Sequence, residues 1–226
     1  MKLLAVETSG DWCSVALWRD GEVIERVLRA GQRQSGHVID LAHELLTSLG
    51  ETVRGMDGFA FGAGPGAFTG LRIACGVVQG FALGAGKPVV GICTLLALAE
   101  ASGASRAVCC LDARMNEIYH AAYERRDGAW AVVHEPSVCA AAKAPTLIND
   151  GWRGMGNGFA VHGDALKAGY GARLSGMDAE AFPRASDIAN LAAPVLMRGE
   201  GVPAEQAVPL YVRDRVALTT RERLRA

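Results

Sequence analysis

A glycine-rich segment at residues 62–70 lies between an apolar stretch at residues 59–61 and a longer one at about residues 71–85. The first stretch has the length of a buried strand and the second that of a helix. Glycine allows close backbone approach and positive φ angles, and Thr69 can cap the helix, whose first N–H groups attract anions. The segment has neither the Gly-Lys-Ser/Thr ending of a P-loop nor the G-x-G-x-x-G of a dinucleotide site. It therefore predicts a tight strand-to-helix connection in an α/β domain.

The alternation of strands and helices extends over most of the chain. Strands are expected at residues 3–7, 13–18, 23–28, 59–61 and 89–92, with helices at about 38–49, 71–85 and 94–101. After a polar boundary at 102–105 come strands at 107–111, 118–123 and 130–133, an unassigned region at 139–182, and a helix at 186–198. This order predicts two related subdomains, residues 1–103 and 104–226, and leaves open whether the C-terminal segment packs back on the first.

Composition excludes several classes of protein. The chain has 226 residues, 50% apolar and 21% charged, so it can bury a core and is too apolar to be disordered. Its formal net charge of -1 gives no general case for a nucleic-acid or membrane surface, and no stretch approaches about 18 consecutive apolar residues. The six cysteines form no C-x-x-C pair and lie mostly in apolar runs, which favours free thiols in a reducing cytoplasm.

Two acidic residues follow predicted strands and are candidates for chemistry. The first belongs to a possible phosphate-binding hairpin, in which a carboxylate holds a metal-bound water and N–H groups face phosphate oxygens. That hairpin consists of Glu7, Thr8, Ser9 and Gly10. The alternative is a plain strand-end turn. Asp112, before Ala113-Arg114, can be catalytic or can pair with Arg114 or a backbone group.

Glycines recur in the helix predicted at 71–85. Gly76, Gly80 and Gly84 are four residues apart and so share one face. Each costs roughly 1 kcal/mol relative to alanine in a helix interior, and close approach of another helix compensates for that cost. The neighbouring helix can belong to this chain or to another.

Metal and nucleophile motifs are not found. His37 and His43 are six residues apart, about 120° around a helix at roughly 100° per residue, so they do not form an i, i+4 chelating pair. We therefore expect no metal site and no catalytic residue. Arginines in the tail after Tyr211 either contact nucleic-acid phosphates or form a solvated or partner-facing segment.

Five segments taken together form a family signature: residues 4–9, 13–18, 64–72, 112–119 and 209–213. The most specific is Gly-Pro-Gly-Ala-Phe-Thr-Gly at 64–70. They resemble the TsaB (YeaZ) family of tRNA threonylcarbamoyladenosine biosynthesis proteins. The similarity runs from about residue 2 to 216 and is weakest at 139–182.

The resemblance implies an α/β fold of the actin-like, Hsp70-like ATPase (ribonuclease H-like) type, with two related subdomains, each a mixed sheet flanked by helices. It implies a non-catalytic relative of TsaD, the subunit that transfers threonylcarbamoyl to N6 of the adenosine beside the anticodon. TsaD holds its metal with a His-x-x-x-His pair, which this chain lacks. Glu7-Thr8-Ser9 stands where the fold's ATPases have an Asp-x-Gly-type sequence, which implies a degenerate nucleotide site. No cofactor is expected in the isolated subunit, and ATP or ADP at an interface of the complex is left open.

The resemblance also implies partners. TsaB-like proteins pair with TsaD, and TsaE, a small P-loop ATPase, joins them; alone, they form homodimers, and tRNA is reached indirectly through TsaD. The first two helices make the contact, which on this chain implies His37, Leu41, Leu45, Leu71, Arg72, Gly76 and Gly80. No membrane is implied. The alternative function is an ATP-dependent phosphotransferase or ATPase of the same fold, while a metallopeptidase is disfavoured by the missing ligands.

Overall fold

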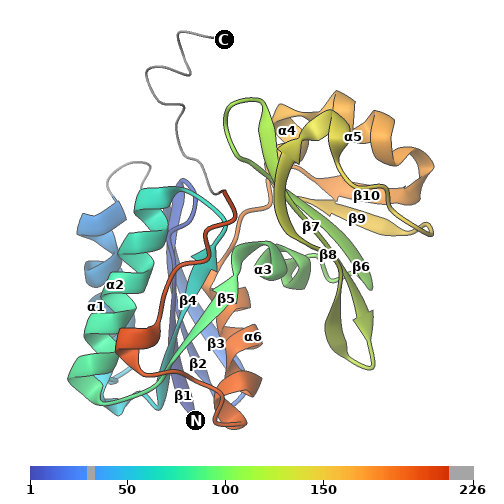
Figure 1. Ribbon diagram of the computed structural model, residues 1–226. Helices are drawn as coiled ribbons and strands as arrows, with labels where there is room; N and C mark the ends of the chain where they lie inside the picture. Colours follow the sequence, from blue (N-terminus) through green and yellow to red (C-terminus); the bar gives the residue numbers. More distant parts are fainter. Residues whose placement is uncertain (30–33, 214–226) are drawn as a thin grey trace, which may run out of the picture.

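The computed structural model describes residues 1–29 and 34–213, which form two lobes, each built on a five-stranded sheet (Figure 1). The N-terminal sheet has the strand order β3-β2-β1-β4-β5. Its strands are β1 (Lys2–Glu7), β2 (Trp12–Arg19), β3 (Glu22–Arg29), β4 (Gly58–Gly64) and β5 (Val89–Cys93). β1 is antiparallel to β2 and parallel to β4, so the sheet is mixed.

Helices cover both faces of this sheet (Figure 1). They are α1 (Gln34–Ser48) and α2 (Phe68–Ala85) on one face and α6 (Ala185–Met197) on the other. In β1, Leu4 and Val6 pack on the α1/α2 side, whereas Leu3 and Ala5 pack on the α6 side. Because successive side chains of a strand point to opposite faces, a strand covered on both sides is apolar throughout, as β1 is.

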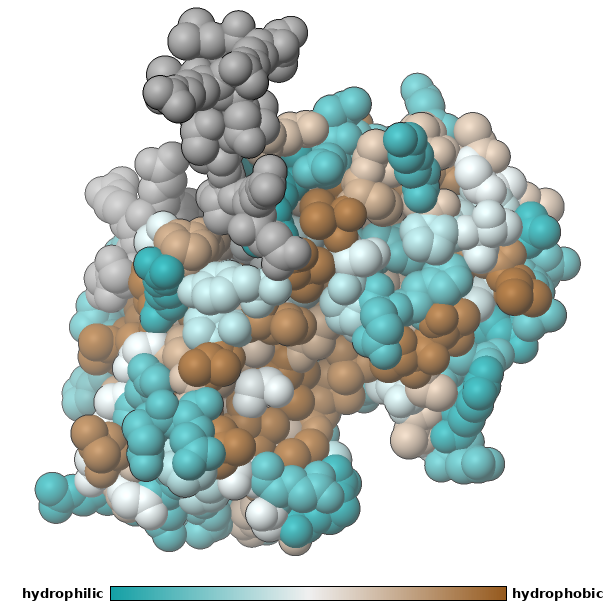
Figure 2. All heavy atoms as spheres, viewed as in Figure 1, coloured by the Kyte–Doolittle hydropathy of each residue, from teal (hydrophilic) through white to brown (hydrophobic). Residues whose placement is uncertain are grey.

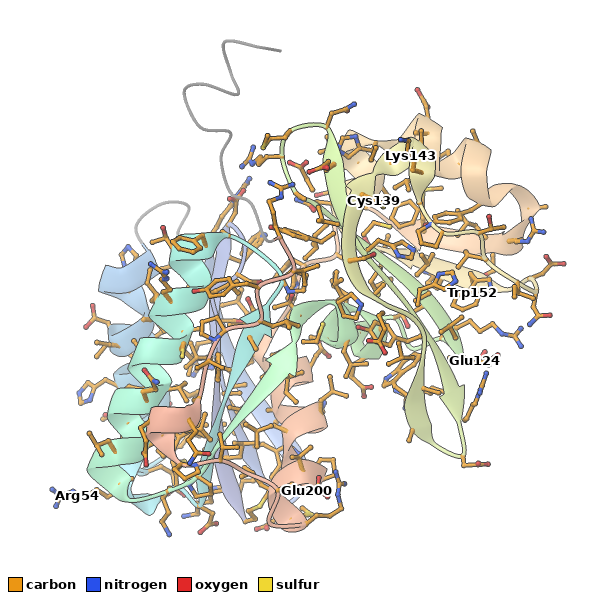
Figure 3. All side chains as sticks on the ribbon, in the orientation of Figure 1. Arg54, Glu124, Cys139, Lys143, Trp152 and Glu200 are labelled. Carbon is orange, nitrogen blue, oxygen red and sulfur yellow. The ribbon has the colours of Figure 1, made fainter. Side chains whose placement is uncertain are left out.

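The C-terminal sheet has the order β10-β9-β6-β7-β8. Its strands are β6 (Arg106–Asp112), β7 (Glu117–Arg126), β8 (Ala129–Ala140), β9 (Trp152–Met155) and β10 (Leu174–Asp178). The short helices α4 (Gly158–Val161) and α5 (Gly163–Tyr170) lie on one face. Figure 3 labels two side chains that belong to this lobe's core, Trp152 from β9 and Cys139 from β8.

Helix α3 (Thr94–Ala101) joins the lobes. It follows β5 directly and packs on β6 and β7 of the second sheet. Leu95 and Leu98 are fully buried there in an apolar cluster with Cys109, Ala121 and Tyr123. On the α3 side, therefore, a hydrophobic core holds the lobes together.

The chain returns to the first lobe after β10. Ala185 N, at the start of α6, donates to Ser14 Oγ in β2 at 2.8 Å, and Arg184 Nη2 pairs with Glu25 Oε2 in β3. Val202 then bridges Val89 of β5. The C-terminal segment thus packs back on the N-terminal sheet.

The element order and the fold class predicted from the sequence are confirmed. Both predicted hairpins form, and at the first of them Asp20 (φ 51°) and Gly21 (φ 96°) take the positive φ values of a two-residue hairpin turn. The unassigned region holds β9, α4, α5 and β10. The capping role expected for Thr69 is wrong, because α2 begins at Phe68. The N-cap residue is Ala67, which makes no side-chain hydrogen bond to the helix.

Among the described residues, α2 alone has the length and apolar composition that could cross a membrane. Its Ala74 and Val78 are buried in the N-terminal core, and its other face carries Arg72. One face of the helix packs on the domain core, and 33% of its residues are buried.

Candidate functional site

A cleft of about 570 Å³ lies between the lobes, away from α3. The N-terminal lobe contributes the hairpin after β1 and the glycine-rich segment before α2, and the C-terminal lobe contributes the residues after β6. Residues 179–183, between β10 and α6, line it as well, and there Phe182 stacks on Trp12 with ring centroids 4.6 Å apart. The segment 210–213 completes the wall. This is where a nucleotide site would lie if the sequence-based hypothesis held.

The carboxyl group of Glu7 is buried behind this wall and does not line the cleft. Its Oε1 accepts a hydrogen bond from the Ser9 backbone N–H, and its Oε2 has no hydrogen-bond partner. Burial raises the pKa of Glu7 to about 7, against the lowering effect of hydrogen bonds from Ser9 and Thr8. Thr8 is also fully buried, so only Ser9 and Gly10 of the predicted hairpin line the cleft.

The hairpin after β1 is bonded to the glycine-rich segment. Thr8 Oγ1 donates to the Gly70 carbonyl at 2.7 Å, and Ala67 N donates to the Ser9 carbonyl at 2.7 Å. A Cβ on Gly66 would lie 2.7 Å from that same Ser9 oxygen, so glycine is required there for close approach. A phosphate would need free N–H donors, but the Ala67 N–H already has a partner. The segment acts as a tight structural connection.

Asp112 is held by its own lobe. Its Oδ1 accepts from Arg114 N at 3.0 Å and lies 3.4 Å from His162 Nε2, while its N–H donates to Asn157 Oδ1 at 2.9 Å. The sequence left two hypotheses for Asp112, a catalytic role or pairing with nearby groups. These contacts favour pairing. His162 and Asn157 were not singled out in the sequence, because α4 and its neighbours lie in the region without a clear pattern.

The residues assigned to a partner surface separate into two groups. Leu41 and Leu45 are buried in the N-terminal core, and Leu71 is buried beside the wall of the cleft. His37 is half-buried, and Arg72, Gly76 and Gly80 are exposed. The structure therefore brings α2's outer face, but not these leucines, to the surface.

The glycine face of α2 is open. A Cβ added at Gly76, Gly80 or Gly84 would meet nothing within 4 Å in the part of the chain that is described. The helix neighbour that would compensate for these glycines is thus not one of this chain's described helices. Figure 2 shows hydrophobic residues gathered on the face of the same lobe that the C-terminal segment crosses. Exposed apolar residues include Leu83, Val202 and Val208.

Metal and redox sites are not found among residues 1–29 and 34–213. They contain no group of three or more His, Cys, Asp or Glu side chains able to hold a metal ion. All six cysteines are free thiols, four of them buried, as their apolar surroundings predict. Of the arginine-rich tail, residues 214–226 lie outside the described part of the chain.

Comparisons with known proteins agree on one family. A family model described as TsaD, tRNA N6-adenosine threonylcarbamoyltransferase, matches residues 29–217. The Escherichia coli (strain K12) protein named tRNA threonylcarbamoyladenosine biosynthesis protein TsaB is 33% identical, covering 96% of each chain. A Haemophilus influenzae protein of the same name is 32% identical, covering 96% of this chain and 95% of its own.

Solved structures give the same result. YeaZ from Pseudomonas aeruginosa superposes with a TM-score of 0.85 and 34% identity, over 93% of this chain and 99% of its own. A second Pseudomonas aeruginosa structure, described as similar to peptidase YEAZ, gives 0.86 and 34%, over 94% and 99%. The fold is that of the actin-like, ribonuclease H-like ATPases. Since the similarity extends over nearly the whole chain in both sequence and structure, the chain belongs to the TsaB (YeaZ) family.

Proposed function

We propose that this chain is a non-catalytic subunit in the biosynthesis of threonylcarbamoyladenosine in tRNA. The names of its relatives support the process. The observation that carries the subunit role is the open glycine face of α2, formed by Gly76, Gly80 and Gly84. Small residues on one face let a second helix approach closely, and no described part of this chain takes that place.

The partner on this face is TsaD. Gly76 and Gly80 lie in the interior of α2 and together cost it roughly 2 kcal/mol relative to alanine, at about 1 kcal/mol each. Packing against a partner helix offsets that cost, and the exposed Arg72 at the same helix adds a residue type enriched at interfaces. His37 on α1 belongs to the rim. In the absence of TsaD a second copy occupies the face as a homodimer, and TsaE joins the TsaD complex.

The chemistry belongs to TsaD. The Ala67 N–H is used by Ser9, and Glu7 is buried, which together support an empty nucleotide site in the isolated chain. The described residues offer no cluster of metal ligands. A net charge of -1 suits a protein that reaches tRNA through another subunit. The site of action is the cytoplasm.

Substitution of one glycine on this face tests the proposal. Gly80→Leu places a side chain at the contact while improving helix propensity, so the monomer folds and TsaD binding falls at least about tenfold, or about 1.4 kcal/mol. Gly169→Leu in α5 is the matched control, because that helical glycine is also open but lies on the other lobe. Binding of TsaD by Gly80→Leu at wild-type affinity would overturn the assignment of this face.

A further inference from the structure

The segment at residues 208–213, here the clasp segment, spans the two lobes at the cleft. Leu210 N donates to the Ala63 carbonyl in β4 of the N-terminal lobe at 2.7 Å. Three residues later, Arg213 Nη2 donates to Glu117 Oε2 in β7 of the C-terminal lobe at 2.6 Å. One hydrogen bond to each sheet therefore connects the lobes through a short stretch of chain.

The two sides of the lobe junction are built differently. On the α3 side the contact is a buried apolar cluster. On the cleft side, three of the six residues of the clasp segment are exposed (70% for Val208, 40% for Leu210 and 47% for Tyr211) and the other three are partly buried. A segment held by a few partly exposed hydrogen bonds opens at much lower free energy than a packed core. The clasp segment is thus the part of the junction that can release while the α3 side stays packed.

The middle of the clasp segment touches α2. Tyr211 Oη accepts a hydrogen bond from Arg72 Nε at 3.0 Å, and its ring lies 5.6 Å from that of Phe68. The Arg72 guanidinium stacks on Phe68 at 3.8 Å. Phe68 is 44% exposed, so the three side chains form a surface cluster next to the glycine face. Tyrosine and arginine are enriched among the residues that dominate binding energy at interfaces.

We propose that the clasp segment couples the partner surface of α2 to closure of the cleft: the partner contacts Phe68, Arg72 and Tyr211 together, and so binds the closed form. This rests on the proposed pairing with TsaD through α2. Because such coupling is reciprocal, a partner that prefers the closed form also stabilises the clasp segment against release. The cleft then opens most readily in the free subunit.

Amide exchange of Leu210, followed by NMR, tests this in the full chain. Glu117→Ala removes the contact with the C-terminal lobe, and Arg72→Ala removes the contact with α2. Each is expected to speed exchange of the Leu210 N–H roughly two- to fivefold, the range for losing one partly exposed polar pair. Arg198→Ala is the matched control, because it breaks an exposed pair with Glu200, which Figure 3 shows at the far end of the lobe. The double variant Glu117→Arg with Arg213→Glu restores slow exchange if the pair itself is responsible.

Adding saturating TsaD completes the test. Leu210 exchange is expected to slow in the wild-type chain and in Glu117→Ala, whose altered site lies off α2. Exchange in Glu117→Ala equal to wild type, or unchanged exchange with TsaD bound, would overturn the inference. If TsaD fails to bind the wild-type chain, the proposed function fails and the coupling with it. The exchange rates of the isolated variants still decide whether the clasp segment closes the cleft.

Discussion

The carboxylate of Glu7 occupies the space beside Gly62 that any side chain at position 62 would need. A Cβ built on Gly62 would overlap Glu7 Oε2, with Thr94 Cγ2 only 3.2 Å away on another side. The acid of the first strand is therefore directed into the glycine-rich connection and not into the cleft. This one contact explains why the sequence motif at residues 7–10 resembles a phosphate hairpin without forming its geometry.

Gly62→Ala is expected to destabilise the fold by about 2 kcal/mol, the usual cost of forcing a methyl group into a packed site. Gly76→Ala is the control, because its Cβ would meet nothing within 4 Å and alanine favours a helix interior. Urea unfolding of both variants measures the difference. Equal stabilities would contradict the close packing of Glu7 against Gly62.

The raised pKa of Glu7 predicts a pH dependence of stability. Since the folded value is about 7 and the ordinary value 4.5, the native state binds more protons than the unfolded state between these pH values. Stability from this group is therefore greatest below pH 4.5, falls as pH rises to 7, and is level above that. The loss is at most about 3 kcal/mol, at about 1.36 kcal/mol per pH unit.

Glu7→Gln removes this contribution, because glutamine has the shape of the protonated acid and does not titrate. Unfolding free energies at pH 5 and pH 8 are expected to differ less in Glu7→Gln than in the wild type. A variant with the same pH difference as the wild type would show that Glu7 ionises normally.

The buried His120 predicts that stability changes with pH in the opposite direction to the contribution of Glu7. Its ring is fully buried, neither nitrogen has a hydrogen-bond partner, and His134 lies 5.5 Å away between ring centroids. Burial, aided by His134, lowers the pKa of His120 to about 4. Because the unfolded imidazole titrates near 6.5, stability is lost as pH falls from 6.5 to about 4. NMR titration of the imidazole should give a midpoint near 4, and a midpoint near 6.5 would contradict its burial.

A nucleotide-binding measurement distinguishes the proposed non-catalytic subunit from the alternative function, an ATPase of the same fold. Calorimetric titration of the isolated chain with ATP and Mg²⁺ is expected to show no binding, because the hairpin and the glycine-rich segment bond to each other through Ala67 and Ser9. Tight binding with turnover would favour an ATP-dependent enzyme instead.

Short-range sequence patterns were enough to predict most helices and strands of the N-terminal lobe. The apolar period and flanking glycines located α2 and β4, and the turn residues Asp20-Gly21 located the first hairpin. The region 139–182 stayed unassigned because its elements are short: β9 has 4 residues and α4 has 4. Such lengths carry too few positions for a period to be recognised.

Long-range contacts could not be predicted from the sequence. Glu25 and Arg184 lie 159 residues apart, and Arg72 and Tyr211 lie 139 apart, yet these pairs fix the return of α6 and the position of the clasp segment. Leu41 and Leu45, which the resemblance implies as partner contacts, are buried in the N-terminal core. Composition on a helix does not by itself say which face meets a partner.

Depletion of this protein, followed by mass analysis of tRNA nucleosides, tests the central claim most directly. Threonylcarbamoyladenosine is expected to fall on depletion and to return with the wild-type chain and with Gly169→Leu, but not with Gly80→Leu. Unchanged threonylcarbamoyladenosine after depletion would contradict the account.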